Sequence, residues 1–117
     1  MWINTETLVS ISDINKDLSS ALKIIDKYGS VVIMKNNMPA YIGVETDAFE
    51  KATLEKMPTI TMREASRNFS TLIYKIYDNA YVLLTKRNVP VCVFYSYSYL
   101  SNFKDLTMQY VKKEKLW

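Results

Sequence analysis

A stretch of fourteen residues occurs twice in this chain. Residues Val31–Val44 read VVIMKNNMPAYIGV, and Val82–Tyr95 read VLLTKRNVPVCVFY, 51 positions further on and without a gap. Each copy has an apolar run, a Lys, a polar pair ending in Asn, an apolar residue, a Pro and a second apolar run. The pattern predicts two strands joined by a tight turn, because Asn tolerates the left-handed backbone of such turns. Pro39 and Pro90 fall at the start of the return strand, where a missing N–H costs least.

The residues before each hairpin repeat at the same offset. Ser10-Ile11-Ser12-Asp13 and Thr61-Met62-Arg63-Glu64 both have the spacing of a capping box. Each opens one predicted amphipathic helix, the first ending at Gly29 and the second at Asp78-Asn79-Ala80. Short strands precede the helices, and further helices are predicted at 46–56 and 96–115. The apolar positions of the two main helices are Ile14, Leu18, Ala21, Leu22, Ile25 and Tyr28, and then Ala65, Phe69, Leu72, Ile73 and Ile76.

The repeat predicts the architecture. A strand, helix, hairpin, helix unit of about 45 residues is too small to bury a core alone, and two copies can solve this by packing on each other. We therefore expect an α+β fold with two units packed as an internal pseudo-dimer. The expected domains are residues 1–58 and 59–117. The hairpins and short first strands are expected in antiparallel sheets backed by helices.

The composition excludes several classes of protein. Hydrophobic residues make up 49% of the 117 positions, which predicts a packed core. The chain has no His and a single Cys, Cys92, which is expected to fill core space. No apolar run approaches a membrane span, and the start does not read as a signal peptide. We expect a soluble cytoplasmic protein without metal or cofactor. No motif for catalysis is present, so a non-enzyme is predicted.

The two halves differ in charge. Residues 1–58 carry six Lys, no Arg and eight acidic residues, whereas residues 59–117 carry nine basic and four acidic residues. All three Arg of the chain lie in the second half. Three of the last six residues are Lys: Lys112, Lys113 and Lys115. These could attract phosphate, or they could complement the end of a helix.

The order of these motifs resembles the N-terminal domain of Phd/YefM-type antitoxins. In the second copy the resemblance is carried by Thr61, Glu64-Ala65, Arg67 (one position from its usual place), Phe69-Ser70 and the turn Thr85–Pro90. In the first copy it is carried by Asp13, Leu18-Ser19 and Met34–Pro39. The resemblance implies a symmetric dimer that binds a palindromic operator, represses its own operon and uses a C-terminal tail to cover a toxin. This chain departs from the family in fusing two units and in its short tail, 104–117.

Candidate DNA contacts follow from the second copy. Arg63 and Arg67 are four apart and should share a helix face. Lys86 and Arg87 stand at the predicted turn. Arg can grip phosphate or the edge of guanine with two hydrogen bonds. Thr61 and the amides at the helix start could hold a phosphate. The alternative is that these are ordinary solvated charges.

The equivalent positions of the first copy are Ser12, Lys16, Lys35 and Asn36. No Arg remains there, so this half has fewer means of reading bases. We therefore expect an asymmetric DNA binder in which the second half carries most of the affinity.

The predicted function is sequence-specific binding of double-stranded DNA, as a transcriptional repressor or autoregulator, or as an accessory factor of a plasmid or other mobile element. The mobile-element role is implied only by where such families occur. The alternative is an antitoxin whose helix from about residue 98 to residue 117 neutralises a protein toxin. The sequence leaves open whether a toxin partner exists and whether two chains pair further.

Overall fold

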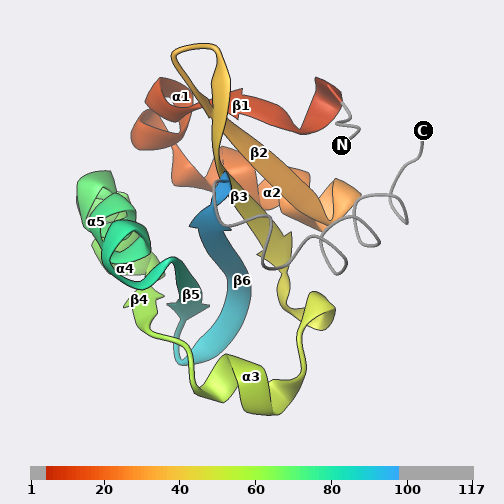
Figure 1. The fold of residues 1–117 in the computed structure, drawn as a ribbon, viewed down its shortest axis with the longest axis vertical. Coiled ribbons are helices and arrows are strands. Elements are labelled where there is room, and N and C mark those ends of the chain that lie inside the picture. Colours follow the sequence, from red (N-terminus) through yellow and green to blue (C-terminus); the bar gives the residue numbers. More distant parts are fainter. Residues whose placement is uncertain (1–4, 98–117) are drawn as a thin grey trace.

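One sheet runs through both halves of the protein. In the computed structural model, which describes residues 5–97, the strand order is β1-β2-β3-β6-β5-β4 (Figure 1). The strands are β1 (Leu8–Ser10), β2 (Ser30–Lys35), β3 (Met38–Glu45), β4 (Thr59–Thr61), β5 (Tyr81–Lys86) and β6 (Val89–Ser96). The α-helices are α1 (Ile11–Lys16), α2 (Leu18–Tyr28), α3 (Lys51–Glu55), α4 (Met62–Arg67) and α5 (Phe69–Asn79). The fold is thus α+β with a six-stranded mixed sheet.

The second half repeats the first, element by element. The first repeat (β1 to β3, residues 8–45) recurs 51 positions later as the second repeat (β4 to β6, residues 59–96). The pairing of β3 with β6 obeys the same offset. Ile42 faces Tyr95 and Val44 faces Val93, and replacing each residue of one pair by its counterpart in the other repeat gives the other pair. The register therefore has an approximate twofold axis, which lies where Gly43 faces Phe94.

The short first strands pair differently from the expectation. β1 runs parallel to β2, with Leu8 opposite Val32, and β4 runs parallel to β5, with Thr59 opposite Leu83. The prediction of antiparallel sheets was wrong for these strands. In each repeat the chain passes through two helices before it returns to the sheet, and such a crossover brings the next strand back in the same direction.

Each predicted main helix is broken in two. Asp17 and Asn68 interrupt the helices with extended backbone, at φ −152° and −148°. Asp17 Oδ1 then accepts a hydrogen bond from Ser19 N at 3.1 Å, and Asn68 Oδ1 accepts one from Ser70 N at 3.2 Å. Each side chain thereby caps the helix that follows it, α2 or α5. The apolar spacing continued across the break, so periodicity alone did not reveal it.

The hairpin turns lie where the sequence placed them. β2 and β3 are joined by Asn36 and Asn37 at φ 53° and 64°, and β5 and β6 by Arg87 and Asn88 at φ 54° and 65°. Two consecutive left-handed residues form the turn that matches the twist of antiparallel strands. Gly29 ends α2 at φ 88°, as expected. The corresponding turn after α5 was predicted at 78–80, and Ala80 has a positive φ of 73° there.

Apolar side chains are buried on both faces of the sheet. Helices α1, α2, α4 and α5 cover one face, where the predicted residues Ile14, Leu18, Ala21 and Ile25 are buried, as are their counterparts. Cys92 is buried on this face too, which confirms it as a core residue. The other face buries residues such as Val44, Val93 and Tyr95.

The segment that joins the repeats packs against this other face. Phe49 and Leu54 lie against it, and Met57 is buried within it. The single helix expected at 46–56 is instead a 3₁₀ turn at Thr46–Ala48, an interruption and the short α3. The predicted helix at 96–115 falls mostly outside the described residues. Within residues 5–97, no helix is long and apolar enough to cross a membrane.

Candidate nucleic-acid interface

Parallel strand pairing brings the start of a helix next to a hairpin turn. In the second repeat Thr61, the last residue of β4, lies opposite Thr85 in β5. One residue further on, α4 begins at Met62, and β5 ends at Lys86, directly before the turn residues Arg87 and Asn88. Thr85 Oγ1 lies 3.5 Å from the carbonyl oxygen of Ile60, within reach of a hydrogen bond between the two strands. Residues that are more than twenty positions apart in the sequence are thereby held side by side.

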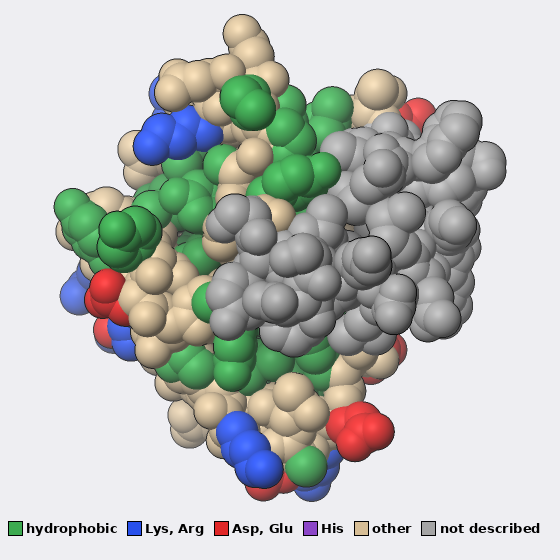
Figure 2. Space-filling model, viewed as in Figure 1, with side chains coloured by type: hydrophobic (Ala, Val, Ile, Leu, Met, Phe, Trp, Pro, Cys, Tyr) green, Lys and Arg blue, Asp and Glu red, His purple; other side chains and the backbone are tan. Residues whose placement is uncertain are grey.

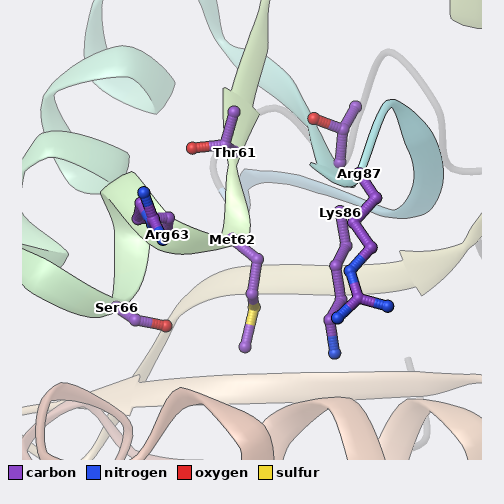
Figure 3. A pocket seen from close by; sticks show the side chains of 7 residues that line it. Thr61, Met62, Arg63, Ser66, Lys86 and Arg87 are labelled. Carbon is purple, nitrogen blue, oxygen red and sulfur yellow. The ribbon is translucent and has the colours of Figure 1, made fainter.

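A hollow of about 380 Å³ lies between this helix and this turn. We call it the basic hollow; its lining residues are Thr61, Met62, Arg63, Ser66, Thr85, Lys86 and Arg87. Figure 3 shows that Lys86 and Arg87 extend in the same direction from the turn, with Met62 alongside them across the gap. Arg63 projects from the start of α4. The hollow therefore brings together four of the five residues predicted in this half.

The start of α4 is already occupied by a carboxylate of the protein. Thr61 Oγ1 accepts a hydrogen bond from Glu64 N, and Thr61 N donates one to Glu64 Oε1, each at 3.1 Å. This reciprocal pair is the capping box that the sequence indicated. The hydrogen bond from the Thr61 amide lowers the pKa of Glu64, with smaller help from the Thr61 hydroxyl and the charge of Lys75. Cations in the hollow, rather than the helix start, are thus the groups available to an anion.

The remaining predicted residues are spread around this arrangement. Arg67, at the end of α4, is exposed but does not line the basic hollow. Lys16 lines a small hollow of about 140 Å³ between the junction of α1 and α2 and the facing side of α4. Asn36 stands at the first hairpin turn with φ 53° and is exposed. Lys35 and Ser12 lie together in a third hollow.

The third hollow is built from both repeats. It has a volume of about 590 Å³, and we call it the amide hollow; its lining residues are Ile11, Ser12, Asn15, Lys35, Asn68, Phe69, Ser70, Ile73 and Tyr74. The first four come from α1 and β2 and occupy positions equivalent to lining residues of the basic hollow. The others come from the start of α5 in the second repeat. Lys35 is the only cation among its lining residues, against three in the basic hollow.

Several lining residues were missed by the sequence reasoning. Asn15 and Ser66 are equivalent in the two repeats and lie three positions after Ser12 and Arg63, so helical spacing could have found them. Tyr74 could not be found in this way, because it reaches the first repeat's hollow from the second repeat. Its position depends on how the repeats pack.

Charged side chains are dispersed over the face drawn in Figure 2. In the view of Figure 2, basic side chains lie around the rim, and those near α3 are mixed with acidic ones. Within residues 5–97, no group of three or more His, Cys, Asp or Glu side chains is placed to hold a metal ion. The basic hollow is a local concentration of positive charge, because three of its seven lining residues are cations.

Lys112, Lys113 and Lys115 and the predicted toxin-binding helix, residues 98–117, lie outside the described part of the chain. No protein-family model matches this sequence, and neither a curated protein nor a solved structure is significantly similar to it.

Proposed function

We propose that this protein binds double-stranded DNA in a sequence-specific manner, as two Phd/YefM-like units packed into an internal pseudo-dimer. The observation that carries the proposal is the basic hollow, where Arg63, Lys86 and Arg87 converge between a helix and a hairpin turn. None of its lining residues is acidic. Guanidinium groups can bind phosphate or the edge of guanine with paired hydrogen bonds.

The two hollows lie on the same side of the sheet. Each is lined by residues of the helices that cover that face, α4 for the basic hollow and α1 with α5 for the amide hollow. One duplex lying across this side could therefore meet both. This is the arrangement by which a dimer places two equivalent elements on two half-sites.

The spacing of the hairpin turns supports the same geometry. β3 and β6 run antiparallel, so their turns lie at opposite ends of the sheet; Figure 1 shows the first turn at the top of the view. Asn37 and Asn88 each precede the twofold position, Gly43 or Phe94, by six residues. At ~3.3 Å per residue, straight strands would place the turns ~40 Å apart; the twist of the sheet shortens this, and the longest principal extent of the protein is 34 Å. One turn of B-DNA is ~34–36 Å.

The role proposed is regulatory binding and not catalysis. A protein of this kind, acting in the cytoplasm as a repressor or as an accessory factor of a mobile element, would recognise its own upstream region. The second repeat would supply most of the affinity, because the basic hollow holds three cations and the equivalent part of the first repeat holds one.

The first test measures binding of the purified protein to its own upstream DNA and to an unrelated duplex at two salt concentrations. We expect tight binding to the upstream DNA that survives the higher salt, because base contacts do not depend on counterion release. Equal binding to both duplexes that collapses with salt would reduce the proposal to charge attraction. Absence of binding to either would contradict it and favour a protein partner such as a toxin.

A second test compares the repeats through two equivalent residues. Replacing Arg67 by Ala should weaken binding to the upstream DNA far more than replacing Lys16 by Ala, since Arg67 lies in the half with more cations. Lys16 is the matched control, because it ends α1 as Arg67 ends α4. Equal losses would contradict the asymmetry while leaving DNA binding itself standing.

A further inference from the structure

We propose that the amide hollow and the basic hollow read different base pairs, so that the protein binds a non-palindromic site in one fixed orientation. The inference rests on the proposed DNA binding and specifies it: the half-site at the amide hollow would contain an A·T pair read by Asn15, and the half-site at the basic hollow a G·C pair read by Arg63 or Arg87.

Asn15 is the amide available for base contact in the amide hollow. Its side chain is exposed and makes no hydrogen bond within residues 5–97. The amide of Asn68 lines the same hollow, but its Oδ1 accepts hydrogen bonds from both Ser70 N and Ser70 Oγ and is held as a cap. A free Asn side chain can pair with N6 and N7 of adenine in the major groove. The second repeat has Ser66 at the position of Asn15, which cannot make this pair.

Tyr74 completes the amide hollow from the other repeat. It is 69% exposed, although it lies on a helix whose apolar face is buried. The equivalent residue of the first repeat is Lys23, so the basic hollow has no aromatic counterpart. A Tyr hydroxyl can bond a phosphate oxygen, and its ring offers an apolar surface beside the groove. The first repeat's half-site would thus be held by a residue of the second repeat.

The basic hollow has the opposite chemistry. The guanidinium of either Arg63 or Arg87 can donate hydrogen bonds to both acceptors of guanine, O6 and N7, and Lys86 can contact a phosphate. The positions equivalent to these Arg residues in the first repeat are Ser12 and Asn36. Because the two ends of the binding surface prefer different bases, rotating the protein by half a turn on its site would mismatch both half-sites.

The structure provides a matched pair of positions for measuring orientation. Met38 and Val89 occupy equivalent positions beside the two hairpin turns and are 67% and 60% exposed. The natural Cys92 is fully buried, and burial raises the pKa of its thiol, so it should not react with a thiol reagent. A cysteine placed at Met38 or at Val89 can therefore carry an iron-EDTA group that cleaves nearby DNA.

The probe is a duplex selected from a random-sequence library by the unmodified protein. We expect the protein labelled through Met38→Cys to cleave at one end of this site, and the protein labelled through Val89→Cys at the other end. The unsubstituted protein, treated with the same reagent, is the control and should not cleave. Cleavage of both ends by each labelled protein would mean two orientations and would overturn the inference.

Two further substitutions test the residues. Asn15→Ala should reduce discrimination of the A·T pair at the end cleaved through Met38 by roughly tenfold, with preference at the other end unchanged. Tyr74→Ala should weaken affinity several-fold, whereas Tyr77→Ala should not. Tyr77 is the matched control, because it lies on α5 and is 86% exposed but does not line the amide hollow.

The outcomes separate this inference from the proposed function. If a palindrome is selected and Asn15→Ala leaves its recognition unchanged while Arg87→Ala weakens binding, the inference is wrong and DNA binding stands. If no sequence is enriched from the library, both are wrong.

Discussion

Gly43 and Phe94 occupy the same position of the two repeats and face each other across β3 and β6. A Cβ atom added to Gly43 would lie 2.7 Å from Cε1 of Phe94 and 3.0 Å from Cγ1 of Val31. The Phe94 ring therefore lies against the space that a side chain at Gly43 would fill. Two Phe residues at this position would collide, and two Gly residues would leave a void. A single chain can hold one of each, which two identical subunits could not.

We predict that this pair is strongly coupled in stability. Gly43→Ala should cost roughly 1–3 kcal/mol by overpacking, and Phe94→Ala about 3–5 kcal/mol by leaving a cavity. The exchanged pair Gly43→Phe with Phe94→Gly should recover much of the loss. Gly43 pairs with Val31 and Phe94 with Val82, so the exchanged ring meets an equivalent Val. Urea unfolding of Gly43→Phe, of Phe94→Gly and of the exchanged protein measures the coupling; a loss in the exchanged protein equal to the sum of the two single losses would contradict the prediction.

The ends of α2 and α5 provide a second prediction. Ala80 follows α5 at φ 73°, where its counterpart Gly29 follows α2 at φ 88°. A left-handed backbone strains Ala but not Gly. Ala80→Gly should therefore raise the free energy of unfolding by roughly 1 kcal/mol, and Gly29→Ala should lower it by at least as much. Thermal unfolding of both variants is the measurement. A destabilising Ala80→Gly would show that chain entropy outweighs the strain.

The internal repeat made most of the fold predictable from the sequence. Hairpin turns, helix caps and buried helix faces are local, and each appeared twice, which separated a pattern from a coincidence. The helix breaks were missed because Asp17 and Asn68 carry their signal in a short cap motif followed by Ser, while the apolar spacing continues past them. A motif of three residues is outweighed by an apolar periodicity that spans fifteen residues, from Ile14 to Tyr28.

The pairing of strands across the sheet was harder to predict from the sequence. Strands of three residues such as β1 and β4 contain too little pattern to fix their direction, and the crossover decides it. The second-repeat side of the amide hollow was inaccessible from sequence, since Tyr74 joins Asn15 only when the repeats pack. The basic hollow was anticipated because its residues occupy one repeat.

The capping box of α4 predicts a dependence on pH. The pKa of Glu64 is lowered in the folded protein, so the unfolded chain binds more protons, and stability rises with pH through this range. The contribution of the ionised Glu64 carboxylate to stability is complete above the carboxyl pKa of the unfolded chain, roughly 4.3. It is lost as pH falls through the lower pKa of the folded protein. The Glu64→Gln variant keeps a side-chain oxygen that can accept the hydrogen bond from Thr61 N, but it has no carboxyl group to titrate. The stability difference between the two proteins should shrink between pH 6 and pH 3 in urea unfolding; a constant difference would contradict the prediction.

The two hairpin turns provide a prediction in which stability and the proposed DNA binding change in opposite directions. Arg87 has φ 54° where its counterpart Asn36 has φ 53°, and Asn tolerates this conformation better than Arg. Arg87→Asn should therefore stabilise the fold by up to roughly 1 kcal/mol while lowering affinity for the upstream DNA about tenfold, by loss of the guanidinium. Asn36→Arg should do the reverse on both counts. Unfolding and DNA titration of each variant measure the two effects; a stabilised Arg87→Asn with unchanged affinity would remove Arg87 from the interface.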